Sequence, residues 1–237
     1  MEISIQYNNF LECECCGSRV AENEWYNSYN LDTEEEFDLI DIVNATCLDR
    51  AMNFLQICPI CGYVSGLEDL DAENNMDIIE EIVSHPNYQM LFESDMNILY
   101  KKWRLLLFLA VQIDDSCLII AICCLKLYDI ITELDLDISF ENFEKEDLLD
   151  STAECLISYL SDDMEDELSG AYIILIIDTF RRLQDKENFF GYIAYIEANM
   201  IEQEDDFSKH IEKEIEWFEN KDFTKKELFI LERDLEI

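Results

Sequence analysis

The sequence ICPICG at residues 57–62 combines residue types and a spacing that demand a specific chemistry. Two cysteines separated by two residues, here Cys58 and Cys61, can turn back so that both thiolates reach one metal ion. Pro59 restricts the backbone in favour of such a turn, and Gly62 permits a positive φ after it. The stretch is therefore predicted to supply half of a zinc site.

The other half is predicted upstream, in the sequence LECECCG at residues 11–17. Cys13 and Cys16 have the same spacing as the first pair and are also followed by a glycine. Together with Cys58 and Cys61 they predict a zinc ribbon in which one Zn²⁺ has four thiolate ligands. A closed coordination shell of this kind is structural, because no position remains for a reacting water.

Other cysteines leave alternatives open. Cys15 and Cys47 are rival ligands, and the segment between the two pairs is longer than in most zinc fingers. The pairs could also be buried reduced thiols or redox CxxC motifs, although neither pair opens a thioredoxin-like strand-to-helix unit. Cys47 lies on the apolar stripe of a predicted helix, which favours core packing. Four further cysteines are predicted to be small core residues: Cys117, Cys123, Cys124 and Cys155.

The composition predicts a mainly helical, folded protein. The chain has 237 residues, of which 49% are hydrophobic, with only two prolines and five glycines. The N-terminus has no basic region followed by an apolar core, and the longest apolar runs are too short to cross a bilayer. We therefore expect a cytoplasmic protein, in which the cysteines bind metal rather than form disulfides.

The charge is strongly negative, with 55 acidic against 16 basic residues and a net charge of −39 at pH 7. A surface this negative repels phosphate, so direct binding of nucleic acid or of a membrane surface is disfavoured. A basic protein is the favoured partner.

Hydrophobic periodicity predicts a series of helices. A first helix starts at Asp32 or Thr33 and continues through Cys47, and a second covers 72–84 and ends before Pro86. Short strands are expected at 3–7 and 53–57, and a strand or turn at 62–66. The remaining helices are expected at 88–113, 116–134, 143–160, 165–183, 187–203, 207–220 and 224–232, with turns at 114–115, 161–163 and 205–206.

The expected fold is mainly α, with two domains. Residues 1–70 form a small β-containing zinc ribbon with an inserted helix, and residues 71–237 form antiparallel helical hairpins. These hairpins predict either a tetratricopeptide-like stack or an irregular helical bundle.

The two cysteine pairs, CxxCG at residues 13–17 and CPICGY at 58–63, together with the helical hairpins, support a resemblance. The chain resembles a bacterial family of unknown function that joins a split zinc ribbon to tetratricopeptide-like helices. The resemblance implies a zinc ion and a helical repeat but no activity.

No enzyme motif is found. The two histidines, His85 and His210, lack a glutamate three residues before them, and no HExxH, phosphate loop, dinucleotide fingerprint or GxSxG sequence occurs. We therefore expect a non-catalytic scaffold or adaptor that binds a basic protein. The alternatives are an acidic mimic of nucleic acid that inhibits a DNA- or RNA-handling enzyme, and an enzyme that uses the cysteine cluster.

Overall fold

The computed structural model describes residues 10–21, 39–49, 52, 55–65, 72–113, 117–139, 141–162, 169–199 and 205–226. In this part the chain is mainly helical, with short antiparallel strands and a cluster of cysteines toward the N-terminus. The predicted fold class is confirmed. The division into domains at residue 70 stays a prediction.

The strands form two separate antiparallel hairpins. β1 (Phe10–Glu12) pairs with β2 (Arg19–Ala21), and β3 (Gln56–Ile57) pairs with β4 (Val64–Ser65). The second hairpin matches the strand predicted before Cys58 and the strand or turn predicted after Cys61, whereas the first hairpin was not predicted. The strand predicted at 3–7 lies outside the described residues.

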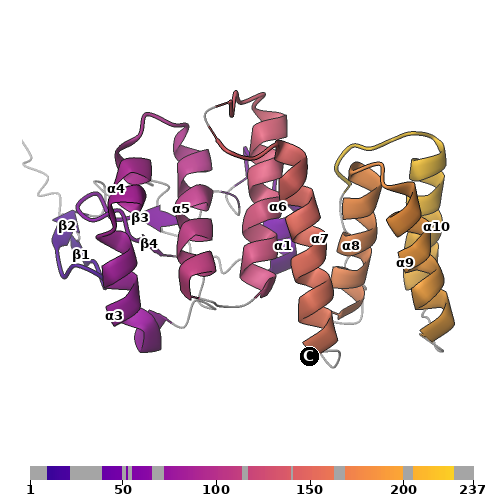
Figure 1. Ribbon diagram of the computed structural model, residues 1–237, viewed down its shortest axis with the longest axis horizontal. Helices are drawn as coiled ribbons and strands as arrows, with labels where there is room; N and C mark the ends of the chain where they lie inside the picture. The colour runs from indigo at the N-terminus through magenta and orange to yellow at the C-terminus, as the bar shows by residue number, and fades with distance from the viewer. Residues whose placement is uncertain are drawn as a thin grey trace, which may run out of the picture.

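The helices lie side by side in a row, with α3 and α4 at one end and α9 and α10 at the other (Figure 1). Along this row α5 packs on α6, α6 on α7 and α7 on α8, while α10 packs against α8. Strand β4 contacts α5, and α1 (Leu39–Asn44) contacts α6. The other helices are α3 (Ala72–Val83), α4 (Pro86–Glu93), α5 (Ile98–Ile113), α6 (Cys117–Glu133), α7 (Lys145–Asp162), α8 (Ser169–Arg182), α9 (Lys186–Asn199) and α10 (Asp205–Glu219).

The prediction of one helix over 88–113 is wrong, because the helical conformation is interrupted between α4, which ends at Glu93, and α5, which begins at Ile98. The Ser94 hydroxyl donates a hydrogen bond to the carbonyl of Leu91, in the last turn of α4, at 2.6 Å. The Asn97 side chain accepts hydrogen bonds from the backbone N–H groups of Leu99 at 2.9 Å and Tyr100 at 3.3 Å, which caps the start of α5. The two polar side chains thus end one helix and begin the next, although the apolar pattern continues across them.

Helix α4 begins two residues earlier than predicted. His85 precedes it in an extended conformation, and its Nδ1 accepts from the backbone N–H of Asn87 at 3.2 Å. Pro86 occupies the first turn, where its missing N–H costs nothing. His85 is thus a helix cap, and α3 ends before Pro86 as predicted.

Helix α1 ends at Asn44, so the prediction that it includes Cys47 is wrong. The Asp49 carboxylate accepts from the backbone N–H of Thr46 at 2.7 Å and from its hydroxyl at 2.8 Å, which forms a turn in place of another helical turn. The predicted start of this helix lies outside the described residues.

The C-terminal boundaries also differ. Asp205 and Asp206, predicted to form a turn, begin α10. Residues 224–226 are not helical, and the rest of the helix predicted at 224–232 lies outside the described part of the chain.

Three of the described helices end in a cap in which a residue other than glycine has a positive φ. Asp135, Gln184 and Lys221 follow α6, α8 and α10 with φ values of 48°, 60° and 57°. In each case the next residue donates its N–H to a carbonyl in the last turn of the helix at 2.8–3.1 Å, the bond of a Schellman cap. Because glycine usually takes this position, the sequence did not reveal these caps.

A buried network of charges joins α6, α8 and α10. Arg181 Nε donates to Glu214 Oε2 at 2.7 Å, and Arg182 pairs with Asp129. Lys225 Nζ, from the segment after α10, lies 2.9 Å from Asp129 Oδ2 and donates to the carbonyl of Ala45 at 2.7 Å. Burial would raise the pKa of Asp129, but its cationic neighbours outweigh burial and lower the pKa to about 2. The network ties the loop after α1 to the C-terminal helices.

Within the described residues, every helix is too short or too polar to cross a lipid bilayer.

Candidate metal centre

The first knuckle, residues 13–17, is the turn of the β1–β2 hairpin. The backbone N–H of Gly17 donates to the carbonyl of Cys13 at 2.8 Å, and the N–H of Cys13 donates to Ser18 at 3.0 Å. Gly17 has a φ of 66°, which glycine adopts without the steric cost of a Cβ. This tight turn places Cys13 and Cys16 on one side of the loop.

The second knuckle, residues 58–62, repeats this geometry in the β3–β4 hairpin. Gly62 N–H donates to the carbonyl of Cys58 at 2.9 Å, and Cys58 N–H donates to Tyr63 at 2.9 Å. Gly62 has a φ of 84°. The N–H of Tyr63 also donates to the Cys61 sulfur at 3.4 Å, a bond that stabilises negative charge on a thiolate.

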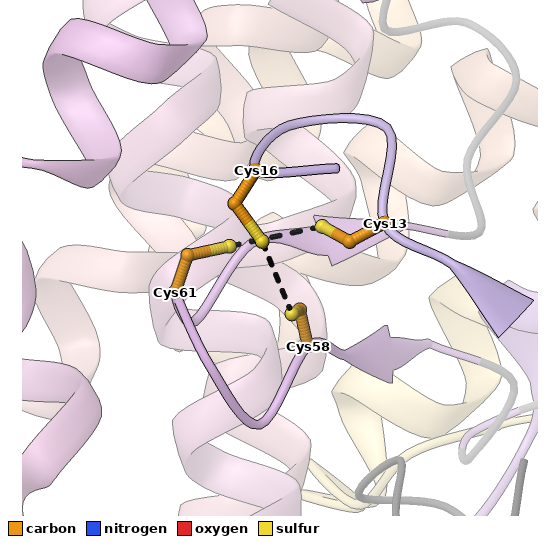
Figure 2. Close-up of side chains that lie close together, drawn as sticks. All are labelled: Cys13, Cys16, Cys58 and Cys61. Atoms are coloured by element: carbon orange, nitrogen blue, oxygen red, sulfur yellow. Dashed lines mark hydrogen bonds between the residues drawn. The ribbon is translucent and has the colours of Figure 1, made fainter. Parts of the chain in front are cut away.

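The structure brings together the four cysteines that spacing selected. Figure 2 shows their side chains converging from the two loops. The sulfurs of Cys13 and Cys61 are 3.7 Å apart, those of Cys16 and Cys58 are 3.9 Å apart, and all four lie within 4.8 Å of one another. A tetrahedral site with Zn–S bonds of about 2.3 Å has sulfurs about 3.8 Å apart. The arrangement is therefore compatible with a zinc site.

The thiols of this group interact strongly. A hydrogen bond with Cys61, followed by burial, raises the pKa of Cys13 well above its usual range, and burial raises that of Cys58. A bond with Cys13 lowers the pKa of Cys61, but the contact with Cys15 and burial outweigh it and leave that pKa raised. Without a cation these sites hold their protons, so a metal ion that binds here must displace them.

Cys16 is the exception. Burial would raise its pKa, but hydrogen bonds from Ser18 outweigh burial and lower the pKa to about 7. Cys16 is also the exposed member of the group, whereas Cys13 and Cys58 are buried. The first knuckle therefore contributes the thiol that is most accessible and most readily ionised.

Helix α4 holds the second knuckle through two side chains. The Tyr88 hydroxyl donates to the carbonyl of Gly62 at 2.9 Å, and Gln89 Nε2 donates to the carbonyl of Cys61 at 2.8 Å. The ring of Phe92 lies where a Cβ on Gly62 would be, with Cγ only 2.7 Å from that position. The ring of Tyr88 packs edge-on against Phe108 of α5, at 5.5 Å between ring centres.

These supporting residues were not predicted. Tyr88 and Gln89 follow the His85-Pro86 helix start, which marks where α4 begins but not what it packs against. Their bonds to the knuckle depend on how the chain folds back over more than twenty residues. The glycine after each cysteine pair indicated the positive φ of the turn, and did not indicate that Phe92 packs against Gly62.

The rival ligands lie outside the group of four. Cys15 is buried next to Cys61, and Cys47 lies near Glu133 at the end of α6. Burial, followed by the neighbouring Glu133, raises the pKa of Cys47 to about 12. Cys47 is partly buried and packs against the core. Of the remaining cysteines, Cys123 and Cys124 are buried, while Cys117 and Cys155 are partly exposed.

No protein-family model, curated protein sequence or solved structure matches this chain. The resemblance to a bacterial zinc-ribbon family stays a prediction. The site is thus defined by its geometry: four convergent thiols that could bind a metal ion, at the N-terminal end of a row of helices.

Proposed function

We propose that the cysteine group binds one structural Zn²⁺ and that the protein acts without catalysis, by binding a partner protein with a basic surface. The single observation that supports the zinc ion best is the spacing of the sulfurs, which is 3.7 Å between Cys13 and Cys61, 3.9 Å between Cys16 and Cys58, and no more than 4.8 Å for any pair. With four thiolates the shell is full, which argues for a structural ion. On this view residues 1–70 and 71–237 are two domains of a cytoplasmic adaptor.

Metal analysis tests the first part of the proposal. Protein purified without added metal should contain one zinc per chain, and the four thiols should resist alkylation under native conditions. After removal of zinc by a chelator, Cys16 should be alkylated first, because it is exposed and has the lowered pKa. Protein that folds fully without metal, with its four thiols open to alkylation, would contradict the structural role.

The charge distribution supports a basic partner. The buried charges nearly cancel within the described residues, so almost all of the net negative charge lies outside the described core. The buried bases are Lys102, Lys126, Arg181 and Arg182, and the buried acids are Asp129, Asp178 and Glu214. Exposed acids lie on helices at one end and in the middle of the row (Figure 1). Those used below are Asp77, Glu80 and Glu81 on α3, and Asp147, Asp150 and Glu154 on α7.

Such a field acts mainly on the rate of association, which should fall as ionic strength rises from about 0.05 to about 0.5 M. A partner recovered by affinity capture should therefore bind more slowly at high salt. Two matched triple variants sharpen the test: D77N/E80Q/E81Q and D147N/D150N/E154Q. If the whole field steers the partner, both should slow association to a similar extent. A large effect of one alone would indicate a local contact, and no salt dependence would contradict the proposal.

A second candidate function is mimicry of nucleic acid, which the net charge of −39 also favours. A mimic must displace DNA or RNA from its target, whereas an adaptor need not. Competition between this protein and an oligonucleotide for the captured partner separates the two. If this protein displaces the oligonucleotide from the partner, with an inhibition constant equal to its own dissociation constant for the partner, the mimic is favoured.

A further inference from the structure

Helices α6 and α7 pack against each other in a register that two contacts establish. Lys145 Nζ lies over the ring of Tyr128 at 5.8 Å from its centre, and the hydroxyl of Thr152 donates to the carbonyl of Ala121 at 3.3 Å. On both helices these contacts are about two turns apart, and they run in opposite directions along the chain. The helices are therefore antiparallel and in contact over at least this length.

The next turn of this register brings two cysteines together. One turn before Ala121 on α6 is Cys117, and one turn after Thr152 on α7 is Cys155. A side chain that reaches the backbone of the neighbouring helix, as Thr152 does, requires a close approach of the two helices. Cys117 and Cys155 therefore face each other at the end of the hairpin where α6 begins.

The environment of the two thiols agrees with this placement. Burial, the neighbouring Cys117 and Glu154 and a hydrogen bond with the Cys117 thiol raise the pKa of Cys155 to about 11. Both cysteines are free and only partly buried, whereas Cys123 and Cys124 on the same helix are buried. A small reagent can therefore reach this pair. None of the four ligands of the candidate metal centre belongs to it.

We propose that Cys117 and Cys155 are a dithiol modification site that forms a reversible disulfide between α6 and α7 by exchange with a small-molecule disulfide. One thiol loses its proton and attacks the reagent, which forms a mixed disulfide and releases one thiol. The second cysteine, after losing its proton, then attacks the sulfur of the first cysteine, which forms the protein disulfide and releases the rest of the reagent as the other thiol. The protein loses two hydrogens and is oxidised, and the reagent is reduced to two thiols.

The disulfide would join two helices that the connection at residues 134–144 already links. Closing this loop restricts the unfolded chain, so the oxidised protein should unfold at a higher temperature than the reduced protein. Because Cys155 holds its proton at neutral pH, formation should speed up as the pH rises. The site gives α6–α7 a redox-dependent stability that is separate from metal binding.

The test treats full-length protein, kept in zinc, with oxidised glutathione, followed by digestion without reductant and mass spectrometry. We expect a cross-linked peptide pair containing Cys117 and Cys155, a loss of two hydrogens, a higher Tm, and full reversal by dithiothreitol. C117S and C155S should each abolish the cross-link. The control C47S removes another partly exposed thiol and should leave it unchanged.

Three results would overturn the proposal: a glutathione adduct on either cysteine that is never resolved, a bond from Cys155 to Cys124, or no reaction at the pair. A second measurement uses the protein without substitutions, so it tests the proposal even if C117S or C155S fails to fold. Phenylarsine oxide bridges two close thiols, so one equivalent should protect both Cys117 and Cys155 from alkylation. Failure of this protection would show that the thiols do not face each other.

Discussion

In both cysteine knuckles a glycine N–H closes the turn, at 2.8 Å in the first knuckle and 2.9 Å in the second. Their surroundings differ. Within the described part of the chain, no atom beyond the two adjoining residues lies within 4 Å of the position that a Cβ on Gly17 would take, and Cys16 is exposed. Gly62 has the ring of Phe92 at that position, and Cys58 is 0% exposed.

The same CxxCG sequence can thus meet two requirements: a turn that presents two cysteines, and a glycine that lets a helix pack closely against that turn. In the first knuckle Cys16 is exposed and Gly17 serves the turn, although Cys13 and Cys15 are buried in the core. The second knuckle is also held by hydrogen bonds from Tyr88 and Gln89 of α4. We infer that the second knuckle is preorganised by the helices, and that the first is held mainly by the ion.

The largest difference is expected between Cys58→Ser and Cys16→Ser. Each removes a ligand of the proposed zinc ion, so zinc affinity should fall more than about 100-fold, beyond the loss usual for residues that only support ligands. Without metal, Cys58→Ser should still lower the free energy of unfolding by about 1–3 kcal/mol, because it buries a hydroxyl. Cys16→Ser should change it by less than about 0.5 kcal/mol.

Competition with a chromogenic chelator measures the affinity, and urea unfolding in the presence of a chelator measures the stability. Cys15→Ser is the control, since Cys15 lies outside the group of four and zinc should still bind. If Cys58→Ser and Cys16→Ser lower the free energy of unfolding without metal by the same amount, the two knuckles do not differ in how the helices support them.

The next effect concerns the two glycines. Gly62→Ala should cost about 2–5 kcal/mol, because the strain of a positive φ is about 1–2 kcal/mol and overpacking against Phe92 adds about 1–3 kcal/mol. Gly17→Ala has the φ strain alone and should cost about 1–2 kcal/mol. Denaturant unfolding of the zinc-loaded protein measures both.

A double-mutant cycle with Phe92→Ala sharpens this result. If the clash is real, Gly62→Ala should cost less in the Phe92→Ala background, where only the φ strain remains. Additive effects would mean that the ring moves aside without cost.

A smaller effect is expected for Tyr88→Phe. The change leaves the ring packed on Phe108 but removes the donor to the Gly62 carbonyl, and should cost about 1–2 kcal/mol with zinc stoichiometry unchanged. Tyr195→Phe is the matched control, because this side chain is 58% exposed and loss of its hydroxyl should have little effect. A Tyr88→Phe protein as stable as the control variant would show that α4 does not hold the second knuckle through this bond.

The smallest effect calibrates the φ strain itself. Gln184 is exposed and has a φ of 60° at the end of α8, close to the 66° of Gly17. Gln184→Gly should therefore stabilise the protein by about 0.5–1 kcal/mol, the strain relieved less the entropy lost by glycine. Thermal unfolding measures the gain. A loss of stability would mean that φ strain does not explain the cost of Gly17→Ala.

Sequence reasoning succeeded where the signal was local. The CxxCG spacing selected four cysteines that the fold brings together, and the strand predicted before Cys58 and the strand or turn predicted after Cys61 located the second hairpin. It failed where polar side chains interrupt an apolar pattern. Ser94 and Asn97 divide one predicted helix into two, and Thr46 with Asp49 ends α1 before Cys47. Periodicity records which residues are apolar, and does not show whether a neighbouring side chain caps the backbone.

Spacing and periodicity were enough to establish the ligand pairs and the helical class, because both depend on residues within a turn or two of each other. Folding settled everything that joins distant segments. Cys15 and Cys16 are adjacent in the sequence, and Cys15 is buried next to Cys61, yet only Cys16 belongs to the group of four sulfurs within 4.8 Å of one another. Likewise Lys225 reaches Asp129 and Ala45 only after the whole row of helices is built. Such contacts depend on how the helices pack together, and no short stretch of sequence predicts them.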